Sequence, residues 1–107
     1  MINKNNRVEQ QNSGRNQMMK GEAGYEQSQD CQVTVKLKKR GKLNIVLNSK
    51  MKKMFGDQII QKAQEELDLL GVKHADVTID DYSALDFVIQ ARIRTAVRRA
   101  RGGEEDV

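Results

Sequence analysis

The chain has no tryptophan and no proline, only 4% aromatic residues and a single cysteine. That cysteine, Cys31, has no partner for a disulfide within the chain, and no cysteine and histidine cluster has the spacing of a metal site. No apolar run approaches the length that spans a membrane, and the first residues lack the apolar core of a signal peptide. We therefore expect a soluble protein of a reducing compartment, the cytoplasm.

The net charge of +4 raises the question of what the basic residues bind. Basic residues gather in two patches: Lys36, Lys38, Lys39, Arg40 and Lys42 in the first, and Arg92, Arg94, Arg98, Arg99 and Arg101 in the second. Either patch suits an acidic partner, the phosphates of a cofactor, a nucleic-acid backbone or simply solvent. Few aromatic side chains leave little to stack on bases, which disfavours nucleic acid.

The chain divides into three parts by composition. Residues 1–22 are polar and without apolar periodicity, so they are predicted to be a disordered leader. Residues 23–101 carry the periodic apolar pattern of one small domain. Residues 102–107 begin with two glycines and end as an acidic tail.

Three stretches of the domain alternate apolar and polar residues, as half-buried strands do: 33–37, 43–47 and 76–80. A short connection containing Gly41 joins the first two, so they are predicted to pair as a β-hairpin.

Two amphipathic helices are also predicted, since apolar residues recur there at helical spacing: Phe55, Ile59, Ile60, Ala63, Leu67 and Leu70 in the first, and Leu85, Val88, Ile89, Ile93, Ala96, Val97 and Ala100 in the second. Asn48 or Ser49 is the expected N-cap of the first helix, and Ser83 that of the second. Gly71 ends the first helix. The predicted fold class is α+β, a two-layer sandwich in the order β-β-α-β-α, with both helices on a small antiparallel or mixed sheet.

Two blocks of sequence carry a family resemblance. Residues 78–92 read TIDDYSALDFVIQAR, while residues 47–49 read LNS and residues 55–59 read FGDQI. In this order and spacing the blocks resemble the acyl carrier protein of citrate lyase, its gamma subunit. The resemblance covers about residues 23–101 and implies the same element order.

The resemblance implies a modification site at Ser28. In that family a serine near the N-terminus lies in a segment of the type Ala-Gly-x-x-Glu-Ser-Gly-Asp and carries the prosthetic group. Residues 23–30 here read AGYEQSQD, so the alanine, first glycine, serine and aspartate match, while Gln27 and Gln29 replace the glutamate and the second glycine. The implied group is 2'-(5''-phosphoribosyl)-3'-dephospho-CoA, joined through a phosphodiester. Taken by itself, Ser28 reads as an ordinary solvated loop residue.

The resemblance further implies a non-catalytic subunit of a hetero-oligomeric lyase. The thiol of the prosthetic group holds acetyl and citryl thioesters, the alpha subunit exchanges acetate for citrate, and the beta subunit releases oxaloacetate. A separate transferase attaches the group. No pairing of a nucleophile with a base is visible in the sequence, which agrees with a carrier. The alternatives are the carrier subunits of malonate decarboxylase or citramalate lyase and, in another class, a small basic nucleic-acid-binding protein.

Four other features invite a functional interpretation. Ser83 is a rival attachment site, but a helix cap explains it. Cys31 is interpreted as a strand residue rather than a nucleophile, because no neighbour would lower its pKa. His74 is interpreted as a solvated loop residue. The pair Asp80 and Asp81 is interpreted as a polar strand end leading into a helix, rather than as a metal or acid–base site.

Overall fold

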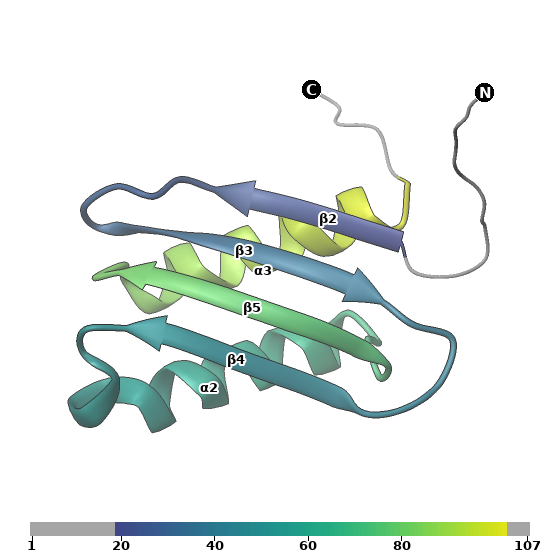
Figure 1. Cartoon of the computed structure of the whole chain (residues 1–107), viewed down its shortest axis with the longest axis horizontal. Helices are drawn as coiled ribbons and strands as arrows, with labels where there is room; N and C mark the ends of the chain where they lie inside the picture. Colours follow the sequence, from purple (N-terminus) through teal and green to yellow (C-terminus); the bar gives the residue numbers. More distant parts are fainter. Residues whose placement is uncertain (1–18, 103–107) are drawn as a thin grey trace, which may run out of the picture.

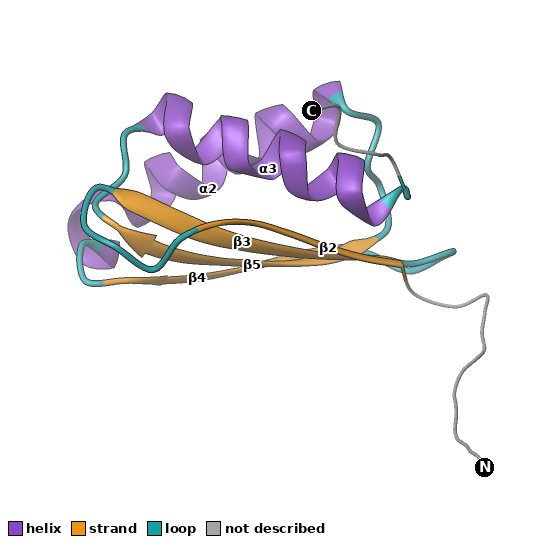
Figure 2. Ribbon diagram, turned by 90° about the horizontal axis from the view of Figure 1, so that it is seen from above, coloured by secondary structure: helices purple, strands orange, loops and turns teal. Residues whose placement is uncertain are grey.

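Two helices cover one face of a four-stranded sheet in the computed structural model, which describes residues 19–102 (Figure 2). The elements are β2 (Met19–Gly24), β3 (Asp30–Leu37), β4 (Leu43–Ser49), α2 (Lys52–Leu69), β5 (Ala75–Tyr82) and α3 (Asp86–Ala100). The predicted α+β class with two layers is confirmed. The sheet has one more strand than predicted, β2, at the start of the domain. No helix within residues 19–102 is long and apolar enough to cross a membrane.

The strands lie in the order β2-β3-β5-β4 (Figure 1). β3 pairs antiparallel with β2 and with β5, whereas β4 pairs in parallel with β5. The predicted hairpin between residues 33–37 and 43–47 is therefore wrong, because β5 lies between those two strands. Alternation identifies a strand but not its partner, and a strand–helix–strand unit such as β4-α2-β5 commonly pairs its strands in parallel.

The strand β2 replaces part of the predicted leader. Residues 19–22, which were expected to be disordered, pair with β3 from Met19 opposite Leu37 to Glu22 opposite Thr34. The buried residues of β2 are Gly21 and Ala23, so the strand has no strong apolar alternation. Residues 1–18 and 103–107, the rest of the predicted leader and tail, lie outside the described residues.

A glycine lets β2 approach α3. A Cβ atom at Gly21 would overlap the backbone carbonyl of Ala96 and the backbone amide of Ala100. Only glycine fits this contact without moving backbone. The last turn of α3 is thereby packed against the start of β2.

The core lies between the apolar face of the sheet and the facing sides of α2 and α3. Its largest fully buried apolar side chains come from β3, β5 and both helices: Val33, Val35, Val77, Ile79, Leu67, Ile89, Ile93 and Val97. The opposite face of the sheet is polar and cross-linked, since Asn44 and Lys38 both donate to Asp76. This clean division fixes which way each strand faces.

Candidate functional site

Ser28 lies exposed in the turn that joins β2 to β3. The Asp30 amide donates to the Gln27 carbonyl at 3.1 Å, which closes a four-residue β-turn with Ser28 at its second position. The Gln29 amide donates to the Tyr82 carbonyl at 2.6 Å and ties the turn to the end of β5. The Ser28 hydroxyl is thus carried by an ordered turn at one end of the sheet (Figure 1).

Gln29 has a left-handed backbone, with φ of 65°. It occupies the third position of the turn, where the type II geometry requires a positive φ and favours glycine. Glycine adopts this conformation without strain, whereas Gln29 adopts it with some strain.

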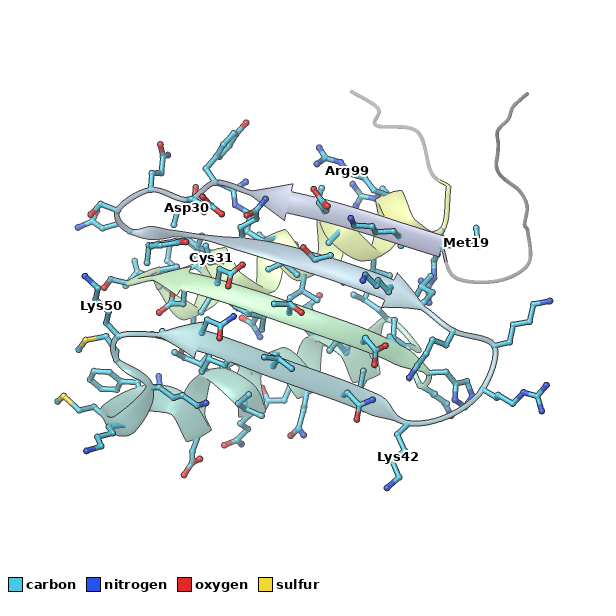
Figure 3. All side chains as sticks on the ribbon, in the orientation of Figure 1. Met19, Asp30, Cys31, Lys42, Lys50 and Arg99 are labelled. Carbon is cyan, nitrogen blue, oxygen red and sulfur yellow. The ribbon has the colours of Figure 1, made fainter. Side chains whose placement is uncertain are left out.

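Asp30 anchors the other side of the turn to α3. The Arg92 guanidinium donates to both carboxylate oxygens, from Nε at 3.0 Å and from Nη2 at 2.8 Å. The Cys31 amide donates to the same carboxylate at 2.7 Å. Asp30 is buried, and the hydrogen bond from Arg92 lowers its pKa below the ordinary value of 3.8. Figure 3 shows Asp30 at the end of the sheet that also carries Lys50, away from Lys42 and Met19.

Most of the predicted basic patch on α3 is engaged within the fold. Arg92 also lies over the ring of Tyr25, with 5.7 Å to its centroid. Arg94 pairs with the buried carboxylate of Glu66 at 3.1 Å. Arg99 and Arg101 donate to backbone carbonyls, those of Glu22 and Leu70 respectively. These contacts connect α3 to β2, to the turn and to α2, so the arginines do not form a simple outward-facing patch.

Asp80 and Asp81 connect the end of β5 to the end of its parallel neighbour β4. Asp81 is buried and accepts hydrogen bonds from the Ser49 hydroxyl at 2.9 Å and the Ala84 amide at 3.0 Å. Asp80 accepts one from the Asn48 amide group at 2.8 Å. The residues described contain no group of three or more His, Cys, Asp or Glu side chains arranged to hold a metal ion. Both residues lie within β5, which continues to Tyr82, and Asp81 orders the loop before α3 through the Ala84 amide.

The predicted helix caps are wrong in detail. α3 begins after Leu85 with no side-chain cap, and Ser83 lies two residues earlier with φ of 70°. α2 begins after Met51, also without a side-chain cap, although the Ser49 hydroxyl accepts the Met51 amide hydrogen at 3.0 Å. Ser83 therefore has no capping role. Its exposed position near Ser28 makes it the residue that a labelling experiment must distinguish from Ser28.

Three loops enclose a pocket of about 520 Å³ at this end of the molecule. Its lining residues come from the turn, from the β4–α2 connection and from the end of β5: Glu26, Gln27, Ser28, Asn48, Ser49, Lys50, Asp80, Asp81, Tyr82 and Ser83. Ser28 contributes an exposed hydroxyl from the turn. Lys50 supplies the one ammonium group among these lining residues. Sequence reasoning missed this pocket, because its three loops lie far apart along the chain.

Neither Cys31 nor His74 adds a reactive group to the pocket. Cys31 is fully buried in β3, and desolvation raises its pKa to about 12. The thiol therefore stays protonated and unreactive at neutral pH. His74 lies at the opposite end, where its Nδ1 is 2.6 Å from the carbonyl oxygen of Gly41.

Comparison with known proteins shows that the chain is similar to a family of carrier subunits. A family model described as malonate decarboxylase delta subunit (MdcD) matches residues 19–100. The citrate lyase acyl carrier protein of Halothermothrix orenii is 38% identical over 85 residues, which are 79% of this chain and 89% of that protein. The one from Clostridium perfringens is 45% identical over 78 residues, covering 73% and 77%. The one from Pectobacterium carotovorum is 48% identical over 65 residues, covering 61% and 68%.

Proposed function

Because this chain belongs to the family of citrate lyase acyl carrier proteins, we propose that it is the carrier subunit of a citrate lyase, modified on Ser28. The observation that carries the site is the exposed hydroxyl on an ordered turn at the mouth of a pocket. The chain itself is a carrier without catalytic activity of its own. In this function it presents a covalently bound prosthetic group to other subunits.

The proposed group is 2'-(5''-phosphoribosyl)-3'-dephospho-CoA, and the residues around Ser28 fit a phosphodiester. The Ser28 oxygen is exposed, so an esterified phosphate stays in water, where its charge is not desolvated. The Lys50 ammonium lines the same pocket. The carboxylates of Asp80 and Asp81 already accept hydrogen bonds from Asn48 and Ser49, which reduces their repulsion of a nearby phosphate.

The group, when attached, supplies a thiol that holds acetyl and citryl thioesters. The chain supplies position: the hydrogen bonds of Gln29 and Asp30 hold the turn that carries the tether. A short tether raises the effective concentration of the thioester at a docked partner into the millimolar range. This division of labour agrees with the inert Cys31.

The proposed partners are the alpha subunit, which exchanges acetate for citrate, and the beta subunit, which cleaves the citryl thioester to oxaloacetate. A transferase that attaches the group is the third. We place the complex in the cytoplasm, where a single buried cysteine stays reduced.

The test is the intact mass of the full chain co-expressed with the attaching enzymes, followed by peptide mapping. We expect one adduct of the mass of the group, on the peptide that contains Ser28. The Ser28→Ala variant should lose the adduct and the lyase activity of the assembled complex, whereas Ser83→Ala should keep both. An adduct on Ser83, or an unmodified protein, would overturn the site.

The malonate decarboxylase carrier remains the second candidate, because the matching family model carries that description. Reconstitution decides between the two. The modified chain should restore citrate cleavage with citrate lyase alpha and beta subunits and should leave malonate decarboxylase subunits inactive. The reverse result would reassign the parent enzyme.

A further inference from the structure

Apolar side chains line a second pocket, of about 440 Å³, where α2 and α3 begin. Phe55, Leu85 and Phe87 are 43%, 62% and 67% exposed there. The sequence pattern placed Phe55 and Leu85 on the core faces of their helices, yet the sheet does not cover them. We call this pocket the Phe groove; its lining residues are Met51, Phe55, Gln58, Ile59, Asp81, Ser83, Ala84, Leu85, Asp86 and Phe87. Exposed apolar side chains gathered around one hollow indicate a binding surface.

The Phe groove adjoins the pocket beside Ser28. Asp81 and Ser83 line both, so the two hollows lie on either side of the same short loop. A group attached to Ser28 therefore begins its tether within reach of the groove. It can enter the groove without the entropy loss of a free ligand.

The charges of the groove indicate which part of such a group fits. Asp86 lines it and accepts a hydrogen bond from the Gln58 side chain at 2.9 Å, and Asp81 is the other carboxylate. The lining residues include no lysine or arginine, so the groove repels phosphate. The pocket beside Ser28 is lined by three carboxylates, those of Glu26, Asp80 and Asp81, but it also has the cation Lys50. A phosphate thus finds an ammonium group only on the Lys50 side, and a neutral portion with amide N–H groups suits the Phe groove.

We infer that the Phe groove binds the amide-containing segment of the prosthetic arm carried by Ser28, the segment that ends in the thiol. This inference rests on the proposed function. The apolar side chains of the groove can cover the methylene groups of this segment, and Asp86 can accept hydrogen bonds from its amide N–H groups. The occupied groove holds the arm against the domain between visits to the partner subunits and shields the thiol from solvent.

The first test compares NMR spectra of the full chain before and after modification of Ser28. We expect chemical-shift changes at Phe55, Leu85 and Phe87, with contacts between their side-chain protons and the arm. Val46, which is 53% exposed on β4 and lines neither pocket, is the internal control and should not shift. Changes confined to residues 27–29 would overturn the inference.

The second test measures how fast the thiol of the modified chain reacts with a disulfide reagent. The double substitution Phe55→Ala and Phe87→Ala should raise this rate about fivefold, as expected for the loss of roughly 1 kcal/mol of apolar contact with the arm. Val46→Ala, the matched exposed apolar control, should leave the rate unchanged. Both phenylalanines lie at the surface, so the variant should keep its fold, which circular dichroism checks.

The outcomes separate the two claims. A missing adduct in the mass spectrum refutes the proposed function before the groove is tested. An adduct on Ser28 with unchanged rates and no shifts at the Phe groove refutes this inference and leaves the proposed function intact. Shifts that occur only after alpha or beta subunit is added would assign the groove to a protein partner and would likewise refute it.

Discussion

At the scale of single residues, Gln29 is the residue whose backbone conformation conflicts most clearly with its side chain. Its φ of 65° lies in the left-handed region, which glycine adopts without strain. The Gln29→Gly substitution should therefore raise the free energy of unfolding by roughly 0.5–1 kcal/mol, even though glycine gains freedom in the unfolded chain. Urea unfolding of the unmodified protein measures this change.

The neighbouring Gln27 gives the matched control, because it is equally exposed and has no positive φ. Gln27→Gly should lower stability by about 0.5–1 kcal/mol, through unfolded-state entropy and through loss of the side-chain hydrogen bond from Gln27 to Asp30. If both glycine variants lost stability to the same extent, the strain at Gln29 would be disproved.

The residue scale also marks how far the sequence could predict the site. Ser28 was reached through a family resemblance, since a lone serine in a polar loop carries no chemical signal of its own. The partners that order its turn, Tyr82 and Arg92, lie more than fifty residues away along the chain. Hydrogen bonds over such separations follow from strand order and helix placement, which no local pattern specifies.

At the scale of elements, the packing of β2 against α3 requires glycine at position 21. Gly21→Ala would place a methyl group against the α3 backbone at Ala96 and Ala100, which cannot yield unless β2 or α3 moves. We expect a loss of about 2–3 kcal/mol in the free energy of unfolding. Urea unfolding measures the loss, and hydrogen exchange should show it concentrated at the β2 amides.

Glu22→Ala is the control for this substitution. Glu22 is the next residue of the same strand, and its side chain is exposed. Its replacement should change stability by no more than about 0.5 kcal/mol, as is usual at the surface. Equal effects of the two variants would contradict the close packing of β2 on α3.

The elements divide into those that the sequence could predict and those that it could not. The helices and the three apolar-alternating strands were predicted, because their periodicity reflects one buried face. The strand β2 was missed, since its buried positions hold Gly21 and Ala23 and give almost no apolar signal. The hairpin was wrong because residues 33–37 and 43–47 are close in sequence, yet the more fully buried β5 occupies the centre between them.

At the scale of the whole molecule, stability should depend on pH through the buried pair of Asp30 and Arg92. The pKa of Asp30 is lowered in the folded state, so its stabilising contribution is complete above the unfolded value near 4. The contribution is lost as the pH falls through the lower, folded value. Removing the partner by Arg92→Ala should cost about 2–3 kcal/mol at neutral pH, because it leaves a buried carboxylate unpaired.

The pH dependence of that cost is the diagnostic result. The difference between wild type and Arg92→Ala, measured by urea unfolding, should be largest at neutral pH and should shrink as the pH falls, because without Arg92 the buried Asp30 becomes protonated at a higher pH than in wild type. Lys62→Ala, which breaks an exposed pair with Glu65, should cost at most about 0.5 kcal/mol at every pH. A cost for Arg92→Ala that did not change with pH would show that packing, rather than charge, holds the turn.

The anchoring of the turn by a distant helix has a consequence for how the serine is recognised. The octapeptide at residues 23–30 contains the proposed attachment serine, but its acidic end is positioned by a guanidinium 62 residues further along. Cut out of the chain, the octapeptide would keep its sequence and lose this conformation. For the proposed modification of Ser28, we therefore expect the attaching enzyme to act on the folded domain and not on the isolated peptide.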